Sequence, residues 1–453
     1  MAVVMLEQAL KDTLVLVLAG GKGTRLKEIT ANRSKPAVEF AGHCRLIDFP
    51  LSNCVNSGLR HIAVLTQYKA QTLIRHLMQY WSPLNQSFGG RLDILPASQQ
   101  LNEDWYSGTA DACYQNIDYI RAFAPKYIMV LSSDHVYQMD YRRVMQSHLQ
   151  NHADVTVSCI EVATEKAASR FGVLNINQQG FVSDFAEKPQ CPKALRDTPG
   201  YCLASMGNYL FDSEVFFKLL QQDELIAGSK HDFGGDIIPR AITRFGVYAH
   251  RFRDKHGDNI QYWRDVGCLD SYWQANMDLL NDPVQLRLDD PDWPIWGQQL
   301  SHSPVSIIKG GGNNQSELQN TIIGQGCYLL DCSIRNSLLS SRCHVKQGAF
   351  VQNSVLLPNV QVGANATINN CIVNSDCCIP ANFVVNDSKL AKNKGFSVSA
   401  GGITLITQEA IDRVMLSKKI HTPAQKVATN LVSGEWNPRE EPGLHNVANL
   451  FMQ

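Results

Sequence analysis

The chain has 453 residues, of which 44% are hydrophobic and 18% are charged, and its formal net charge is −1 at pH 7. This length allows two or three globular domains, and the near balance of charge excludes a bulk attraction to nucleic acid or to anionic lipid. We therefore expect neither nucleic acid nor a membrane as a partner, and any basic site must be local.

The first residues and the cysteines predict a cytoplasmic protein. The opening segment MAVVMLEQALK lacks the basic start and the cleavage site of a signal peptide, and no apolar run approaches the roughly 18 residues of a membrane span. The 13 cysteines are odd in number and include no CxxC pair, which disfavours both a disulfide framework and a zinc ribbon. We interpret them as reduced, mostly buried thiols.

Short apolar runs alternate with amphipathic segments from residue 14 to about residue 280. One such segment, residues 69–81, predicts a helix because Leu73, Ile74, Leu77 and Met78 recur at helical spacing. Continuous apolar runs predict strands buried on both faces of a largely parallel sheet, at residues 14–19, 61–66, 127–133 and 154–162. The first domain is therefore predicted to be α/β and doubly wound.

A different period follows a segment rich in proline and glycine, residues 281–316, which predicts a linker or an extended crossing segment. Beyond it, aliphatic residues recur every five or six positions, a spacing that fits neither a helix nor an amphipathic strand. A near-hexad predicts a β-helix, and a β-sandwich with evenly spaced strands remains the alternative. The twelve positions are Ile323, Leu329, Ile334, Leu339, Val345, Val351, Leu356, Val362, Ile368, Val373, Ile379 and Val385.

The stretch from Val15 to Pro36, VLVLAGGKGTRLKEITANRSKP, predicts a site for anions. It leaves a strand, breaks into three glycines and carries five basic residues. Backbone N–H groups at such a strand-to-helix turn bind phosphates, and glycine lets the backbone approach them closely. The spacing matches neither the P-loop nor the dinucleotide-binding fingerprint. A plain tight turn remains the alternative, which the clustered basic residues disfavour.

With the glycine loop, nine further motifs follow one another in a fixed order. They are DFPLSNCVNSG (48–58), TQY (66–68), WYSGTADA (105–112), SSDHVY (132–137), FGVL (171–174), FAEKP (185–189), ASMGNYLFD (204–212), HDFGGDIIP (231–239) and YWRDVG (262–267). Together they resemble the glucose-1-phosphate adenylyltransferases, or ADP-glucose pyrophosphorylases, of the bacterial glycogen pathway. The resemblance covers roughly residues 14 to 410.

This resemblance implies the reaction ATP + glucose 1-phosphate → ADP-glucose + pyrophosphate, a requirement for Mg²⁺, and a homotetramer. It also implies a Rossmann-like (GT-A-like) mixed-sheet domain over residues 1–280. A linker would follow at 281–316. A left-handed parallel β-helix with a C-terminal tail, serving regulation and oligomerisation, would occupy residues 317–453.

Asp134 follows an apolar run and is therefore expected at the carboxyl end of a strand, where open α/β sheets bind ligands. The resemblance makes Asp134 and Asp265 the ligands of Mg²⁺, which typically takes one or two carboxylates plus phosphate oxygens. It assigns Arg25 and Lys35 to the triphosphate and to the leaving pyrophosphate. The remaining ATP-binding positions would be Gly20, Gly21, Gly23, Thr24, Gln67 and Gly108.

For the sugar phosphate, the resemblance assigns Lys188 to the phosphate and Glu187 to the sugar hydroxyls. An unpaired buried carboxylate is costly, so a contact with Glu187 would discriminate strongly between sugars. Further contacts would come from Tyr106, Gly172 and Ser205. The catalytic set implied is thus Arg25, Lys35, Asp134, Lys188 and Asp265.

Three small departures from the family pattern, at Ser107, Ser133 and Cys268, fall within the active-site motifs and remove no charged group. The larger departures lie in the expected effector site. Members activated by fructose 1,6-bisphosphate carry Lys at the position of Asn32 and Arg at that of Gln408, and Asp412 replaces a further basic residue. Glu39 stands where the family has an AMP-binding His, although Arg33 and Arg45 are retained as possible effector contacts. Since a hydrogen bond to a charged group is worth about 1.5–3 kcal/mol, we expect weak or altered activation by that bisphosphate.

Two other functions stay open from the sequence. A nucleotidyltransferase acting on another nucleotide or sugar phosphate would share these motifs, because base contacts cannot be read from spacing. A non-catalytic regulatory subunit would share the two domains, although such relatives tend to lose the carboxylates or basic residues that this chain keeps.

Overall fold

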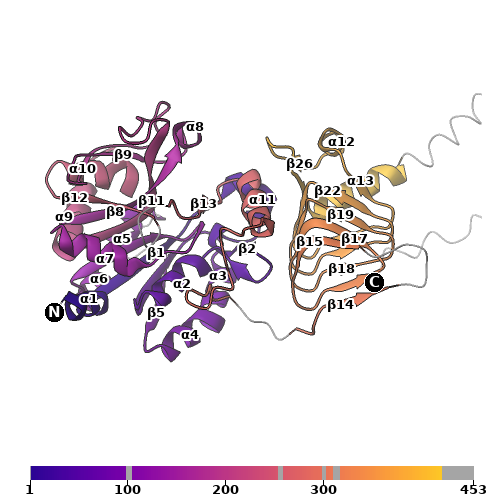
Figure 1. Ribbon diagram of the computed structural model, residues 1–453, viewed down its shortest axis with the longest axis horizontal. Helices are drawn as coiled ribbons and strands as arrows, with labels where there is room; N and C mark the ends of the chain where they lie inside the picture. The colour runs from indigo at the N-terminus through magenta and orange to yellow at the C-terminus, as the bar shows by residue number, and fades with distance from the viewer. Residues whose placement is uncertain (1, 98–104, 254–258, 298–301, 310–316, 421–453) are drawn as a thin grey trace, which may run out of the picture.

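The computed structural model describes residues 2–97, 105–253, 259–297, 302–309 and 317–420. It contains an α/β domain followed by a β-helical coil, which lie side by side in Figure 1. No helix among the described residues combines the length and the apolar character that a membrane crossing requires.

The α/β domain is built on a nine-stranded mixed sheet. Its parallel half has β1 (Thr13–Ala19) between β4 (His61–Thr66) and β6 (Tyr127–Ser132), with β5 (Arg91–Pro96) at the edge. The other half contains β11 (Tyr201–Asp212), which runs antiparallel to β6, β8 and β9. Its remaining strands are β8 (Val155–Ala163), β9 (Val173–Ile176), β10 (Val182–Ala186) and β12 (Val247–Arg251).

The sheet is buried on both faces, as continuous apolar strands require. Alternate residues of β1 face opposite sides: Val15 and Val17 belong to one core, whereas Leu14 and Leu16 belong to the other. The flanking helices include α1 (Ala2–Lys11), α2 (Asp48–Asn56), α4 (Ser82–Ser87), α5 (Thr109–Tyr114), α6 (Ile117–Phe123), α7 (Tyr141–Gln150), α8 (Thr164–Ala167), α9 (Ser213–Glu224), α10 (Ile238–Ile242) and α11 (Leu269–Met277). All four predicted strands are present, and the mixed-sheet prediction is confirmed.

The helix predicted over residues 69–81 is present but irregular. An α-helical turn, α3 (Gln71–His76), passes into a π-helical turn, η3 (Leu77–Trp81). Leu73 and Leu77 are buried as expected, whereas Met78 is 62% exposed and Trp81 is fully buried. The wider π turn shifts the apolar face, so the regular helical period places Met78 on the wrong side.

The C-terminal domain is a β-helix with three faces. One face stacks β14 (Ser306–Ile308), β16 (Tyr328–Leu330), β18 (His344–Val345), β21 (Gln361–Val362) and β24 (Cys378–Ile379), all parallel. The other two share β17 (Ser333–Leu339) and comprise β15 (Glu317–Ile323), β19 (Phe350–Gln352), β20 (Val355–Leu356), β22 (Thr367–Asn369), β23 (Cys371–Val373), β25 (Val384–Val385), β26 (Ser397–Val398) and β27 (Thr404–Ile406).

The predicted hexad is confirmed by burial. Eleven of the twelve aliphatic positions are buried, and Ile323, in the first coil, is half-buried. The strands of successive coils pair in parallel, with Val345 opposite Val362 and Val351 opposite Ile368. This parallel stacking rules out the β-sandwich and agrees with a left-handed β-helix.

The ends of the coil differ from the expected boundaries. Its first strand, β14, lies at Ser306–Ile308, inside the segment expected as a linker before residue 317. This short strand was not predicted because the prolines and glycines around it are typical of a linker. At the far end, α12 (Ser388–Asn393) and α13 (Gln408–Ile420) cover the coil, and Ile411 of α13 is fully buried in its core. The expected tail beyond residue 420 lies outside the described residues.

A shared hydrophobic core joins the two domains. It combines Leu26 and Tyr272 of the α/β domain with Leu338, Val355 and Ile372 of the coil, and all of these side chains are fully buried. The indole N–H of Trp273, in α11, donates to the backbone oxygen of Asn353 at 2.9 Å. The coil therefore packs directly against the elements that follow the glycine loop and Asp265.

The burial of the hexad predicts which coil residues carry stability. Ile368→Ala should lower the free energy of unfolding of the coil by about 2–5 kcal/mol, because it leaves a cavity in a closely packed core. Val384→Ala, at a position 44% exposed on the next coil, should change it by less than about 0.5 kcal/mol. Thermal unfolding followed by circular dichroism measures both, and equal losses would contradict the prediction.

Candidate active site

A cleft of about 660 Å³ opens at the carboxyl edge of the parallel strands. It is lined by residues that come from every part of the α/β domain, from the glycine loop to residue 265. Thirteen of the expected site residues line it: Gly20, Gly21, Arg25, Lys35, Gln67, Tyr106, Gly108, Asp134, Gly172, Glu187, Lys188, Ser205 and Asp265. Gly23, Thr24, Arg33 and Arg45 are not among its lining residues.

The glycine loop differs in detail from the expected phosphate cradle. Gly23 has a φ of 64° and precedes η1 (Thr24–Thr30), a 3-10 helix that is interrupted at Lys27. A Cβ on Gly23 would lie 2.8 Å from the Cβ of Lys35, so glycine is required for the turn and for the position of Lys35. Gly20 and Gly21 thus face the cleft, whereas Gly23 and Thr24 shape the loop behind it.

Two carboxylates meet at the floor of the cleft because of a short antiparallel ribbon. Asp134 lies between β6 and β7 (His135–Tyr137), and Asp265 ends β13 (Trp263–Asp265). The register of β7 and β13 places Asp265 opposite His135. A strand that follows β6 directly and a strand about 130 residues further along the chain thereby bring both carboxylates to one point.

Lys35 lies between these carboxylates. Its Nζ is 2.7 Å from Oδ2 of Asp134 and 3.4 Å from Oδ1 of Asp265, and its side chain is 6% exposed. Burial disfavours the ammonium, but the two carboxylates together raise the pKa of Lys35 above its ordinary value. Lys35 therefore stays charged at neutral pH.

The same contacts keep Asp134 ionised. Burial alone would raise its pKa, but the charges of Lys35 and His135, with hydrogen bonds from Lys35 and Ser132, hold the pKa of Asp134 well below its usual range. The hydroxyl of Ser132 donates to Oδ1 of Asp134 at 2.5 Å. An ionised carboxylate at this depth can serve as a ligand for a cation without first losing a proton.

The donor set at this point fits a divalent metal ion. Asp134, His135 and Asp265 each offer one ligand atom, and these atoms all lie within 4.8 Å of one another. Carboxylate oxygens are the ligands that hard divalent cations prefer. The sequence analysis missed His135, whose ring also packs edge-on against Trp263 at 5.0 Å between centroids. Its place directly after Asp134 gave no signal, because neighbours along a strand normally face opposite sides.

The expected sugar-phosphate residues also line the cleft. Nζ of Lys188 lies 2.5 Å from Oε1 of Glu187, and the Lys188 side chain is 59% exposed, so it can reach an entering anion. Oε2 of Glu187 lies between Gly172 and Gly234, where added Cβ atoms would come within 2.9 and 2.7 Å of it. Ser205 lies near Tyr209, with 3.4 Å between their hydroxyl oxygens.

Gln67, expected at the nucleotide, bonds to Tyr106, which is expected at the sugar phosphate. The side-chain amide of Gln67 donates to the backbone oxygen of Tyr106 at 3.2 Å, and the Tyr106 hydroxyl accepts from Asn116 at 2.9 Å. Tyr106, assigned to the sugar phosphate, thus lies on the same segment as Gly108, assigned to the nucleotide. This segment thus carries positions expected for both substrates.

Several lining residues had no predicted role. They include two basic residues, an aspartate and two aromatic residues, some of them on segments whose motifs were recognised without a function for each position. The residues are Arg170, Lys230, Asp232, Phe233 and Trp263. The motif HDFGGDIIP was the available signal for Asp232 and Phe233.

The effector candidates lie outside the cleft lining and are engaged locally. Arg33 forms an ion pair with Glu39, and the side chain of Arg45 donates to the backbone oxygen of Ala37 at 3.1 Å. Gln408 donates to Asp412 at 2.8 Å and accepts from the backbone N–H of Cys378.

Comparison with known proteins agrees with this geometry. The family model described as "Nucleotidyl transferase" matches residues 14–282, and the one described as "GlmU-like, C-terminal hexapeptide" matches residues 303–406. The chain is thus a nucleotidyltransferase with a C-terminal β-helix of hexapeptide repeats, a class of enzyme that generally uses a divalent metal.

Curated relatives cover nearly the whole chain. A glucose-1-phosphate adenylyltransferase of Teredinibacter turnerae is 47% identical over 405 residues, which are 89% of this chain and 96% of the relative. Proteins of the same name from Nitrosospira multiformis and Dechloromonas aromatica are 43% and 44% identical, over 91% and 88% of this chain and 97% and 92% of their own lengths. The chain belongs to the glucose-1-phosphate adenylyltransferase family.

The position of Lys35 predicts a competition with the metal. Lys35→Met should strengthen Mn²⁺ binding in the absence of nucleotide by about tenfold, because the ammonium no longer neutralises Asp134 and Asp265. Isothermal titration calorimetry measures this affinity. Lys188→Met, which removes a cation paired with Glu187 instead, should leave it unchanged. Weaker Mn²⁺ binding by Lys35→Met would contradict the prediction.

Proposed function

We propose that this chain transfers the adenylyl group of ATP to glucose 1-phosphate, releasing ADP-glucose and pyrophosphate, with Mg²⁺ as its metal. The observation that carries the proposal is the gathering of Arg25, Lys35, Asp134, Lys188 and Asp265 in one cleft at the carboxyl edge of the sheet. Membership of the family supports the choice of substrates.

The reaction needs charge compensation rather than a protein nucleophile. A phosphate oxygen of glucose 1-phosphate forms a bond to the α-phosphorus of ATP, while the bond from that phosphorus to the β-phosphate oxygen breaks. Both reactants are anions, so repulsion and developing negative charge form the barrier. Arg25 and Lys35 neutralise the triphosphate, and Lys188 neutralises the sugar phosphate as it enters.

The carboxylates of Asp134 and Asp265 would hold the metal. A bound Mg²⁺ supplies positive charge to the phosphate oxygens and orients them for displacement in line. Lys35, which pairs with these carboxylates, would exchange them for phosphate oxygens, so the same ammonium serves both states of the cleft.

The sugar half of the cleft would select glucose through Glu187. Its carboxylate is confined between Gly172 and Gly234, which leaves little freedom for it to follow a different pattern of hydroxyls. A sugar that cannot donate to it leaves a partly buried carboxylate unpaired, and this is the source of discrimination.

We also propose a compartment, an oligomeric state and a metabolic role for the enzyme. We place it in the cytoplasm, as a homotetramer that supplies ADP-glucose for glycogen synthesis under allosteric control. All 13 cysteines are free thiols, which suits a reducing compartment. The first coil exposes Ile307, Ile308 and Leu318, apolar side chains that a second copy would cover.

The decisive assay is pyrophosphate release by the purified chain with Mg²⁺, ATP and glucose 1-phosphate. The proposal predicts turnover that Asp134→Asn reduces by about a hundredfold or more, because one metal ligand loses its charge. Asp140→Asn is the matched control: Asp140 caps α7 by accepting from the backbone N–H of Arg142, and asparagine caps equally well.

Two outcomes of this assay would favour an alternative function. Faster turnover with UTP than with ATP would indicate another sugar-1-phosphate nucleotidyltransferase. No turnover by the chain alone, together with stimulation of a second subunit, would indicate a regulatory protein of the same architecture.

Fructose 1,6-bisphosphate should activate the enzyme weakly, by less than about twofold. The Arg33 guanidinium is already paired with Glu39, and Gln408 and Asp412 bond to each other where a bisphosphate would need cations. Rate assays with and without the bisphosphate measure this, and Gln408→Arg should increase the activation. Strong activation of the unchanged enzyme would contradict the prediction.

A further inference from the structure

The turn formed by residues 230–234 is a wall of the cleft with no assigned role. It connects α9 to a π-helical turn, η4 (Phe233–Ile237), and it contributes Lys230, Asp232, Phe233 and Gly234 to the lining. Its shape therefore helps to set the shape of the cleft.

This turn touches the sugar half of the cleft. The ring of Phe233 stacks on that of Tyr209, with 5.7 Å between centroids and 27° between planes, and Tyr209 lies beside Ser205. Gly234 lies against the Glu187 carboxylate, so closely that a Cβ there would be 2.7 Å from Oε2. A displacement of the turn would move both neighbours.

The turn also forms hydrogen bonds with the segment of Thr109 and Ala110, which follows Tyr106 and Gly108 of the cleft lining. The backbone N–H of Ala110 donates to the oxygen of His231 at 2.7 Å, and that of Phe233 donates to the hydroxyl of Thr109 at 3.0 Å. Thr109 in turn donates to Asp232 at 3.0 Å. A Cβ on Gly108 would collide with the backbone oxygen of His231. The backbones of Gly108 and of the turn are therefore in direct contact.

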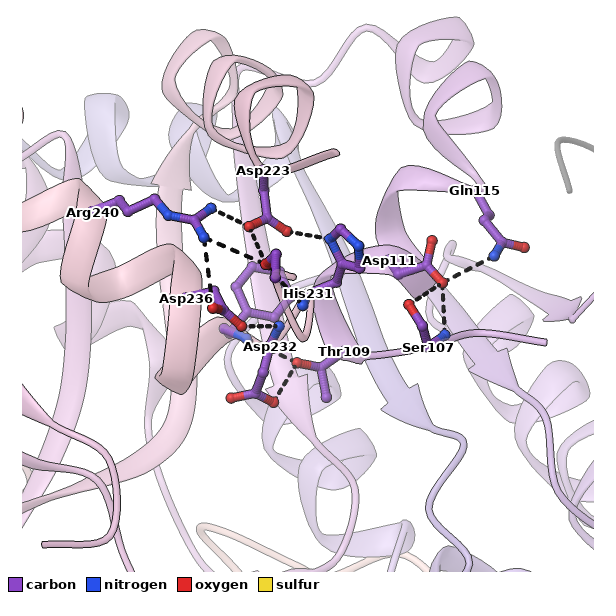
Figure 2. A network of polar contacts seen from close by, with 11 residues as sticks. Ser107, Thr109, Asp111, Gln115, Asp223, His231, Asp232, Asp236 and Arg240 are labelled. Atoms are coloured by element: carbon purple, nitrogen blue, oxygen red, sulfur yellow. Dashed lines mark hydrogen bonds and ion pairs between the residues drawn. The ribbon is translucent and has the colours of Figure 1, made fainter. Parts of the chain in front are cut away.

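Behind the turn, away from the cleft, a buried carboxylate holds it in place (Figure 2). Asp223, near the end of α9, has a side chain 2% exposed and lies 2.7 Å from both Nδ1 of His231 and the hydroxyl of Ser229. Arg240 of α10 pairs with the same carboxylate. Neither Asp223, His231 nor Arg240 lines the cleft.

The ionisation of Asp223 determines which atom donates in its hydrogen bond with His231. Burial would raise the pKa of Asp223, but hydrogen bonds from Ser229, His231 and Arg240 lower it, so the group is a carboxylate and can only accept. Nδ1 of His231 must therefore donate. His231 itself has a φ of 51°, an uncommon backbone conformation that Asn, Asp and His adopt more readily than other side chains.

We propose that Asp223 is a positioning residue for sugar-phosphate recognition, which acts by holding His231 and thereby the 230–234 turn against Glu187 and Tyr209. The inference rests on the proposed function for the identity of the ligand. Asp223 itself does not line the cleft. It holds the 230–234 turn, which does.

An isosteric pair of variants tests this bond. His231→Asn keeps a donor close to the position of Nδ1, and asparagine tolerates a positive φ. His231→Asp introduces a side chain of the same shape and the same backbone tolerance, but it replaces the donor by an acceptor that faces the Asp223 carboxylate. Any difference between the two variants therefore reports the interaction with the Asp223 carboxylate rather than the loss of the imidazole.

The expected result separates sugar recognition from catalysis. His231→Asp should raise KM for glucose 1-phosphate by about tenfold or more relative to His231→Asn, with KM for ATP changed by less than about twofold. Adding Asp223→Asn to His231→Asp should recover part of the loss, because the new amide at position 223 can then donate to the carboxylate introduced at position 231. Equal KM values in the two single variants, or an equal rise for ATP, would overturn the proposal.

A second readout needs no substrate. Amide hydrogen exchange of residues 105–114 and 229–237 should be faster in His231→Asp than in His231→Asn, because the bonds between these segments open more often. Equal exchange would overturn the proposal even if the enzyme prefers another sugar. Failure of the proposed function is distinct: it would appear as absence of pyrophosphate release by the unchanged chain. If His231→Asp does not fold, Asp223→Asn alone, compared with the unchanged chain, provides the same two readouts.

Discussion

The ammonium of Lys35 between the carboxylates of Asp134 and Asp265 is the interaction on which the rest of the structure depends. Two partly buried negative charges at one point are costly unless a cation neutralises them. The glycine bend at Gly23 lets Lys35 reach that point, and the ribbon of β7 and β13 brings the carboxylates to it. The resulting cluster is compact and open to the cleft, and Lys35 and Asp134 are held in their charged forms, which are the properties that metal and phosphate binding require.

The coil takes part in holding this arrangement. The hydroxyl of Ser397 donates to Glu28 at 2.7 Å, and Nζ of Lys27 donates to the backbone oxygen of Val398 at 3.2 Å, so the coil contacts the helix that follows the glycine loop. Asp270, at the start of α11 and just beyond Asp265, accepts from the backbone N–H of Gly401 at 3.2 Å. The two segments that deliver Arg25 and Asp265 to the cleft therefore rest on the C-terminal domain.

The sequence predicted those parts of the protein whose signal is local and periodic. The apolar run of β1 and the hexad through Ile368 identify buried strands without knowledge of their partners. Asp134 could be located because it ends such a run. Pairings across long separations could not be predicted: β13 meets β7, and the 230–234 turn meets Thr109, through contacts that no spacing encodes. Asp223 was missed for that reason. His135 was missed because neighbours along a strand normally face opposite sides, and the π turn at Met78 because one extra residue in a turn leaves no trace in composition.

The central claim is that Lys35 exchanges carboxylate for phosphate when metal and nucleotide enter the cleft. A crystal structure of the complex with Mg²⁺ and a non-hydrolysable ATP analogue tests it most directly. The account predicts Nζ of Lys35 within hydrogen-bond distance of a phosphate oxygen, with the metal on Asp134 and Asp265. Lys35 still bonded to Asp134, with the triphosphate bound elsewhere, would contradict it.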